Sequence, residues 1–258
     1  MQYVQYEKHS DHIAVITLNR PERLNALGAQ IVVDIEEAFC RYADDKAARV
    51  AVLRGAGKAF CAGADMREWG VKGGPPDVPE HRKVFMDPMG TPSLMKPVVA
   101  AVHGYCLGAG LNLILMRCDI RICGESTKFG MPEAERGIIN VVTPFAYNNI
   151  PTCFLSELVY TCDMVSAQRA HHFGVVNTLV PDDQVFPAAL RMAQRIAQQS
   201  PRAIRLTKEA LQRSVEPPPT AFVWERYLTS KSFYSPESQE GMRAFVEKRE
   251  PRWPADPG

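Results

Sequence analysis

The amino-acid sequence predicts an α/β domain built on parallel strands and followed by a helical C-terminal region. Short apolar, β-branched segments such as residues 50–53 and 97–102 are typical of strands that are buried on both faces of a sheet. Helical patterns alternate with these strands, which is the order of a parallel sheet with crossover helices. Beyond residue 184 the pattern is helical only, interrupted by Pro201 and by Pro217-Pro218-Pro219.

The N-terminal elements are predicted in the order hairpin, helix, strand. Residues 4–7 and 12–18 alternate in polarity on either side of Ser10-Asp11, as in a β-hairpin. In residues 27–42 the apolar side chains recur at helical spacing, which predicts an amphipathic helix. The buried-type strand 50–53 follows, and together these elements form a β-α-β unit.

Two turns of small residues are the central feature of the sequence. The first, residues 59–66, follows a strand and precedes a predicted helix. The second, residues 104–110, contains three glycines and precedes a helix at residues 111–116, so its backbone amides lie at a helix N-terminus that favours negative charge. A strand at residues 119–123 then leads to Glu133. Two turns could supply two backbone donors to one oxygen, with a carboxylate nearby for acid/base chemistry.

The remaining segments complete the predicted organisation. Residues 69–95 are expected to form a long loop with a weak helix, a feature often found over functional sites. We expect residues 1–196 to form the core with the active site and residues 197–258 to form a helical region that packs on this core or on a neighbouring subunit. Further elements are expected as helices at 155–161, 166–173, 184–199, 204–213, 220–233 and 237–247 and a short strand at 177–180.

Charge and cysteine content exclude several classes of protein. The net charge of +1 gives no electrostatic argument for binding to nucleic acid or to an anionic membrane surface. Seven cysteines without CxxC spacing argue against a disulfide framework and against a zinc site. The N-terminus lacks a basic-then-apolar signal pattern, so we expect a cytoplasmic protein.

A membrane helix is the main alternative for the second turn and its flanks. Residues 97–116 carry no formal charge and are long enough to span a bilayer. The segment also contains Pro97, His103, Asn112 and three glycines, which a strand, a turn and a helix explain better. We therefore expect no membrane span here. The histidines at 103, 171 and 172 lack metal-type spacing with carboxylates, so no metal site is expected either.

The order and spacing of seven segments resemble the crotonase (enoyl-CoA hydratase/isomerase) superfamily over nearly the full length of the chain. These segments are NRPERLNAL (19–27), GKAFCAGADM (57–66), KPVVAAVHGYCLGAGLNL (96–113), CDIRI (118–122), KFGMPE (128–133), AHHFGVVN (170–177) and SPESQEGMRAFVEKREPRW (235–253). The resemblance implies a superhelix of ββα turns with a helical C-terminal trimerisation region, and assembly as a trimer or a dimer of trimers. It also implies a coenzyme A thioester as substrate and no separate cofactor.

The same resemblance assigns roles to individual residues. The backbone amides of Ala64 and Ala109 correspond to the two donors that hold the thioester oxygen, and Glu133 corresponds to the general acid/base. Hydratases carry a second glutamate on the helix after the glycine turn, but this chain has Asn112 there, and an amide cannot transfer a proton near neutral pH. The residues implied in substrate or coenzyme A binding are Arg23, Ala62, Asp65, Met66, Gly108 and Lys248.

Three functions follow from these assignments. The first is hydration or dehydration of a 2-enoyl-CoA, with Glu133 as acid/base and Asn112 orienting water. The second is double-bond isomerisation of an enoyl-CoA or another reaction that needs one carboxylate, which the amide at 112 favours. The third is a catalytically silent protein that binds an acyl-CoA. The acyl group itself is not encoded in any readable pattern, although residues 69–95 and 139–148 are expected to shape its pocket.

Overall fold

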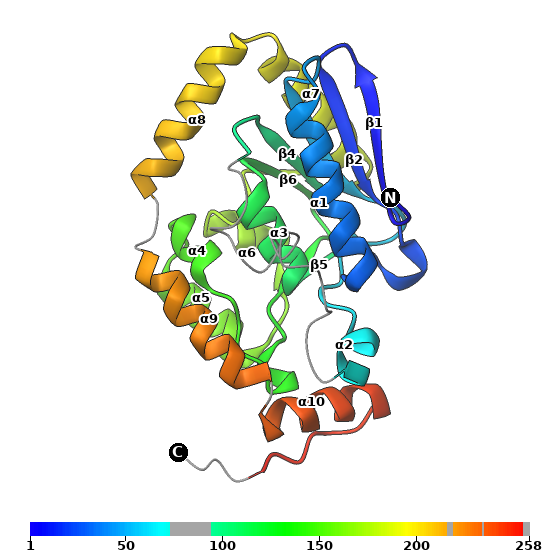
Figure 1. Ribbon diagram of the computed structural model, residues 1–258, viewed down its shortest axis with the longest axis vertical. Coiled ribbons are helices and arrows are strands. Elements are labelled where there is room, and N and C mark those ends of the chain that lie inside the picture. Colours follow the sequence, from blue (N-terminus) through cyan, green and yellow to red (C-terminus); the bar gives the residue numbers. More distant parts are fainter. Residues whose placement is uncertain (73–93, 216–218, 234, 255–258) are drawn as a thin grey trace.

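A six-stranded β-sheet forms the centre of the computed structural model, which describes residues 1–72, 94–215, 219–233 and 235–254 (Figure 1). The strand order is β1-β2-β3-β4-β6-β9. β1 and β2 form the predicted antiparallel hairpin, and every later neighbour pairs in parallel. The strands are β1 (Val4–Ser10), β2 (Ile13–Leu18), β3 (Val50–Gly55), β4 (Val98–Val102), β6 (Ile120–Gly124) and β9 (Thr178–Val180).

Both faces of the sheet are buried along its central strands β2, β3, β4 and β6, as the apolar strand patterns predict, whereas most of the edge strand β1 is exposed. One face packs against α7 (Val185–Ala197) through the side chains Ile13, Val15, Val50, Val52, Val99, Ala101 and Ile122. The other packs against α1 (Ala29–Asp44) and α3 (Ala109–Arg117), and its strand residues include Ala14, Ile16, Leu18, Ala51, Leu53, Val98, Ala100 and Val102. Since side chains alternate between the two faces of a strand, continuous apolar segments are needed to fill both layers.

A small three-stranded sheet lies beside the main one and was not predicted. β5 (Tyr105–Leu107) pairs in parallel with β7 (Lys128–Gly130), which pairs in antiparallel fashion with β8 (Val165–Ser166). Strands of two or three residues are too short to carry a periodic pattern. β5 lies within the second turn and β7 leads toward Glu133, so this sheet fixes the two segments relative to each other.

The other helices surround this framework. Figure 1 shows the C-terminal helices α8 and α9 along one side of the molecule and α10 across its lower end, next to α2. Their positions agree with the predicted helical segments, and the proposed boundary between residues 196 and 197 stays a prediction. The bounds are α2 (Met66–Lys72), α4 (Thr143–Tyr147), α5 (Thr152–Thr161), α6 (Ala167–His172), α8 (Pro201–Val215), α9 (Pro219–Phe233) and α10 (Pro236–Glu247).

The predicted loop at residues 69–95 lies mostly outside the described residues. Its first residues belong to α2 rather than to a loop. Across the described ranges, no helix is both long and apolar enough to cross a bilayer. The uncharged segment 97–116 forms β4, a turn with β5, and most of α3, as the strand–turn–helix interpretation predicts.

Candidate active site

The first small-residue turn connects β3 to α2. Its amide at Ala62 donates to the carbonyl of Leu24 at 3.0 Å, which fixes the start of the turn. Gly63 has a φ of +92°, a conformation that side-chain-bearing residues rarely adopt. The next residue, Ala64, forms an isolated parallel bridge with Leu27. The amide of Leu27 donates to Gly63, and its carbonyl accepts from Asp65.

The second turn lies directly against the first. A Cβ atom on Gly63 would come within 3.1 Å of the carbonyl oxygen of Leu107 and within 3.9 Å of the amide nitrogen of Ala109. Gly108, at a φ of +49°, precedes α3, and its own amide donates to Gly130 of β7 at 2.8 Å. The structure therefore brings together the two turns that the sequence places about 45 residues apart.

The amides of Ala64 and Ala109 are uncovered. The carbonyl of Gly63 and the amide of Asp65 both form hydrogen bonds with Leu27. The N–H of Ala64, which lies between them in the chain, therefore points to the opposite side. Ala109 is the first residue of α3, where an N–H has no acceptor within the helix. Within the described ranges, neither amide donates a hydrogen bond to another group. Two such amides on abutting turns can hold the oxygen of a polarised carbonyl.

Glu133 places its carboxyl group against the second turn. A Cβ atom on Gly108 would lie 2.5 Å from Oε1 of Glu133, so only glycine leaves room for this approach. The backbone of Glu133 has helical torsion angles, and its carbonyl accepts from the amides of Arg136 and Ile138 at 2.9 and 3.1 Å. This short turn directs the side chain back toward Gly108. Glu133 thus lies against the turn that carries Ala109, and this turn abuts the one that carries Ala64; the roles of the three residues stay predictions.

Burial changes the acid strength of this carboxyl group. Oε2 of Glu133 is out of contact with solvent and has no hydrogen-bond partner among the described residues. Burial raises the pKa of Glu133 to about 7, and the nearby positive charge of Arg136 opposes the shift only in part. A carboxyl group with a pKa near neutrality is present in both protonation states at pH 7, so it can both take up and deliver a proton. Glu135 is by contrast exposed and paired with Arg136.

Asn112 lies in the first turn of α3, near Ala109. Its backbone N–H donates to the carbonyl of Gly108 at 3.0 Å, so its side chain lies one turn into the helix. The residue is buried, and Oδ1 has no partner in the part of the chain that the structure describes. Buried amide oxygens are normally hydrogen-bonded, so this acceptor is available to a water or a substrate group.

An apolar cluster packs against the first turn. It consists of Met66, Trp69, Ile138, Phe233 and Met242, and Ala64 contacts it from the side of the site. The segment that follows Glu133 is held to α9, because the hydroxyl of Ser232 accepts from the amide of Ile139 at 2.8 Å. Met66 is the one predicted substrate-binding residue that belongs to the apolar cluster.

The remaining predicted binding residues lie around this centre. Arg23 is partly exposed and directly precedes Leu24, which anchors the first turn. Lys248 ends α10 and lines a cavity of about 590 Å³ together with Ala134, Glu135 and Arg136, the residues that follow Glu133. The structure therefore places both basic residues next to segments of the site. Whether they bind coenzyme A stays a prediction.

The sequence did not indicate the interactions of Asp65. Its Oδ1 accepts from the amide of Arg67 at 3.1 Å, and its Oδ2 lies 3.0 Å from Nη1 of Arg20. Oδ1 is thus hydrogen-bonded, whereas Oδ2 is paired with the charge of Arg20 but has no hydrogen-bond partner among the described residues, and a contact between Asp65 and substrate stays a prediction. Arg20 lies in a polar, proline-containing stretch that is typical of a solvated turn, so no local pattern signals its burial.

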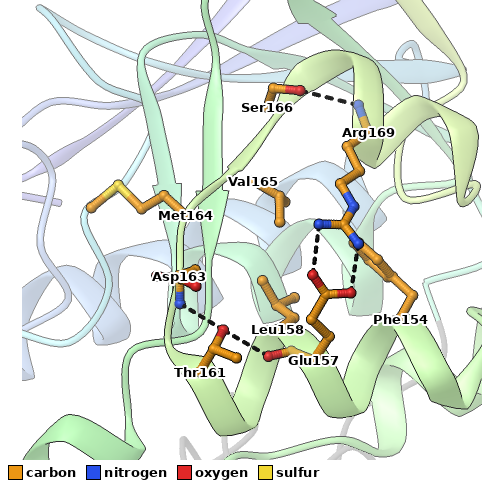
Figure 2. Close-up of a pocket in the computed structure, with 9 residues that line it drawn as sticks. All are labelled: Phe154, Glu157, Leu158, Thr161, Asp163, Met164, Val165, Ser166 and Arg169. Carbon is orange, nitrogen blue, oxygen red and sulfur yellow. Dashed lines mark hydrogen bonds and ion pairs between the residues drawn. The ribbon is translucent and has the colours of Figure 1, made fainter.

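A further pocket of about 310 Å³ is separate from this site. Figure 2 shows that it lies between α5 and the β8–α6 segment, with the ion pair of Glu157 and Arg169 on its wall. None of the predicted site residues lines it. The described residues also contain no group of three His, Cys, Asp or Glu side chains that could hold a metal ion.

Several known proteins resemble this chain over nearly its full length. A family model described as enoyl-CoA hydratase/isomerase matches residues 8–256. Mevalonyl-coenzyme A hydratase sidH of Aspergillus fumigatus is 34% identical, over 94% of this chain and 91% of its own. A probable mitochondrial enoyl-CoA hydratase of Dictyostelium discoideum is 35% identical, over 93% of this chain and 87% of its own. The crystal structure of carnitinyl-CoA hydratase from Mycobacterium avium is 29% identical, with a TM-score of 0.85 and 98% of each chain covered.

An α/β fold with two uncovered amides beside a buried carboxyl group defines a class of protein that can stabilise an oxyanion and move a proton. The chain belongs to the enoyl-CoA hydratase/isomerase family, because the family model covers nearly all of it and relatives above 30% identity align over most of their length. The resemblance predicted from the seven sequence segments is therefore confirmed, as is the crotonase-like α/β fold.

Proposed function

We propose that this protein adds water to a 2-enoyl-CoA thioester, and removes it in the reverse direction. The observation that carries this proposal is the position of Glu133, whose Oε1 lies against Gly108 at the start of the helix that presents the Ala109 amide. A single pocket would then contain the carbonyl oxygen, the reacting carbons and a proton carrier. The relatives named as hydratases support the same reaction.

The two amides act on the thioester oxygen. Attack of water on C3 moves the electrons of the double bond toward the carbonyl and places negative charge on its oxygen. The N–H groups of Ala64 and Ala109 then donate to this enolate oxygen, and each well-placed donor in a water-excluding site contributes about 3 kcal/mol to the lowering of the barrier. Collapse of the enolate with protonation at C2 restores the carbonyl and gives the 3-hydroxyacyl-CoA.

Glu133 carries the proton in this scheme. As a carboxylate it accepts a proton from the attacking water, and as the resulting acid it delivers a proton to C2. Asn112 contributes an acceptor oxygen that orients the water but transfers no proton. Water is added as OH at C3 and H at C2, so the reaction is balanced without any redox change. We therefore propose that no cofactor besides the coenzyme A of the substrate takes part.

Isomerisation is the second candidate, and the side chain at 112 favours it. An isomerase needs one base that removes a proton from C2 of a 3-enoyl-CoA and returns it to C4 of the dienolate. The same amides would hold the dienolate oxygen, and Glu133 alone would suffice. Hydration by two carboxylates would need a second carboxylate at position 112, where this chain has an asparagine.

Substrate binding extends beyond the reacting atoms. We propose that Arg23 and Lys248 interact with the phosphates of coenzyme A, and that Ala62, Met66 and Gly108 line the path of the thioester. Arg23 lies beside the first turn and Lys248 beside the segment after Glu133, which supports these roles. Asp65 would act only indirectly, since its carboxylate is engaged by Arg20. A cytoplasmic location remains part of the proposal.

Self-association through the C-terminal helices is also proposed, as a trimer or a dimer of trimers. α8 and α9 expose many large apolar side chains, which is unusual for the surface of a soluble protein. The exposed residues are Leu206, Leu211, Val215, Val223, Trp224, Tyr227 and Leu228. Burial of this surface against a second copy would remove it from water, whereas the net charge of the chain provides no opposing repulsion.

Replacement of Glu133 by glutamine tests the central assignment. The variant should lose turnover of crotonyl-CoA while it still binds butyryl-CoA, because glutamine keeps the shape but carries no transferable proton. Glu135→Gln, two residues away at an exposed position, is the matched control and should keep its activity. Full activity of the Glu133→Gln variant would show that another group carries the proton.

A second assay separates the two reactions. A 2-enoyl-CoA and a 3-enoyl-CoA are incubated with the wild-type protein in deuterated water and analysed by mass spectrometry. Hydration gives a 3-hydroxyacyl-CoA with deuterium at C2. Isomer interconversion without any 3-hydroxy product decides for the isomerase, and binding without conversion of either compound decides for the catalytically silent alternative.

A further inference from the structure

Arg20 is a buried arginine with partners on both sides of the first turn. Its side chain is 9% exposed, and that of its partner Asp65 is 5% exposed. Nη1 lies 3.0 Å from Oδ2 of Asp65 and donates to the carbonyl of Ala26 at 3.3 Å. Nη2 donates to Oε1 of Glu68 at 3.1 Å. A buried guanidinium in such a position needs these partners, because an unpaired charge in the interior is costly.

These contacts flank the bridge that orients the Ala64 amide. The bridge pairs Ala64 with Leu27 through two backbone hydrogen bonds of 2.7 and 3.0 Å. Arg20 binds Ala26, the residue before Leu27, and Asp65, the residue after Ala64. One guanidinium group thus connects the two strands of the bridge next to the paired residues. A change in this group would alter the direction of the Ala64 N–H without touching the alanine itself.

Glu68 extends the same network to two helices. Its Oε1 accepts from Arg20 and its Oε2 accepts from the amide of Ala29 at 2.9 Å, the first residue of α1. Asp65 accepts from the amide of Arg67 near the start of α2. The first turn is therefore held between α1 and α2 by charged groups rather than by apolar packing alone.

We propose that Arg20 is a positioning residue of this enzyme, which aims the Ala64 N–H at the substrate carbonyl through its ion pair with Asp65. The inference rests on the proposed function, since it assigns a purpose to the amide of Ala64. Arg20 acts only through Asp65 and Ala26. The alternative role is purely structural, in which Arg20 stabilises the fold without any effect on the carbonyl.

Two ligands that differ only at the carbonyl distinguish these roles. Butyryl-CoA carries the thioester oxygen, whereas S-butyl-CoA is the thioether that lacks it, and neither can be hydrated. The dissociation constant of S-butyl-CoA divided by that of butyryl-CoA measures how strongly the site binds the carbonyl oxygen. Arg20→Met should reduce this ratio by about tenfold and lower kcat by roughly 10- to 100-fold, which is less than the roughly 100- to 1,000-fold cost of removing a donor because the N–H is misdirected and not removed. Arg20→Lys, which keeps the charge, should recover part of both.

Lys208→Met is the matched control. The side chain of Lys208 is also 9% exposed, and its Nζ lies 2.9 Å from Oδ2 of Asp119. Lys208 also donates to the carbonyl of Lys96, so this ion pair lies at the N-terminal ends of β4 and β6. The site lies at the opposite ends of the strands. The control variant should lose stability without any change in the ligand ratio. If Arg20→Met fails to fold, Asp65→Asn is measured instead, because asparagine keeps the acceptor for Arg67.

Each outcome has one interpretation. The positioning role is supported if the Arg20 and Asp65 variants lose affinity for butyryl-CoA selectively. The carbonyl stretching frequency of a ¹³C-labelled thioester should also fall less on binding to these variants than on binding to the wild type. Equal weakening of both ligands, no change in the ratio, or the same change in Lys208→Met overturns it. If the wild-type protein binds both ligands equally, the proposed oxyanion hole itself is wrong, and this inference falls with it.

Discussion

The raised pKa of Glu133 predicts that the active-site carboxyl group destabilises the folded protein at neutral and alkaline pH. Burial raises the pKa of Glu133 from 4.5 to about 7. Below pH 4.5 the group is protonated in both the folded and the unfolded chain and costs nothing. Between pH 4.5 and 7 the unfolded chain releases the proton while the folded chain retains it, so stability falls as the pH rises. Above pH 7 the full cost is present.

The size of this effect follows from the two pKa values. A tenfold change in proton affinity corresponds to about 1.4 kcal/mol, so a pKa difference of about 2.5 corresponds to about 3 kcal/mol. Glu133→Gln has no ionisable group at this position and avoids the cost. Its free energy of unfolding should match that of the wild type at pH 4 and exceed it by about 3 kcal/mol at pH 8, although the variant is expected to be inactive.

Urea unfolding of both proteins between pH 4 and 8, at one protein concentration, measures this difference. The difference between the two free energies of unfolding should grow between pH 4.5 and 7 and then remain constant. A flat difference for Glu133→Gln would refute the argument that burial shifts this carboxyl group.

Other expected results concern activity and assembly. The value of kcat/KM should change with an apparent pKa near 7, and this dependence should disappear from the residual activity of Glu133→Gln. Ala109→Pro removes one amide hydrogen at the first helical position, where proline is tolerated, so kcat should fall by roughly 100- to 1,000-fold with little loss of stability by calorimetry. Gly108→Ala should impair activity strongly, because its Cβ would meet Oε1 of Glu133, and a crystal structure should show the carboxyl group displaced. Asn112→Ala should lower the rate of hydration more than the rate of isomerisation in the two-substrate assay. Trp224→Glu should reduce the assembled mass measured by analytical ultracentrifugation if α9 forms a subunit contact.

Local patterns were sufficient to predict the main sheet and the two turns. A turn of small residues that follows an apolar strand is visible in the sequence, and so is the glutamate after residues 128–132. Contacts between distant segments were not visible. Nothing local shows that Gly63 and Leu107 abut, and the short strands β5 and β7 that hold these segments have no pattern of their own.

Buried polar residues were the second limit of the sequence. Arg20 and Asp65 are separated by 45 positions, and each is of a type that usually lies at the surface. Asn140 is a similar case, since it is buried in the segment after Glu133 with an Oδ1 that has no partner among the described residues. The hydrogen bonds of Ser232 and Glu225 of α9 to the same segment also depend on tertiary structure.

The asparagine at position 112 and the near-neutral pKa of Glu133 are related, because a single carboxyl group must then act as both acid and base. In a pair of carboxylates, the two groups repel each other and their environments separate their pKa values into an acid and a base. With Asn112 at the second position, burial raises the pKa of Glu133 to about 7 against the opposing charge of Arg136, and one group then occurs in both protonation states at pH 7. The proton taken from one atom and the proton given to another would therefore pass through the same side chain. Such a carrier reaches only one face of a substrate whose carbonyl is fixed by two amides, so hydration would be a syn addition and isomerisation a transfer on a single face.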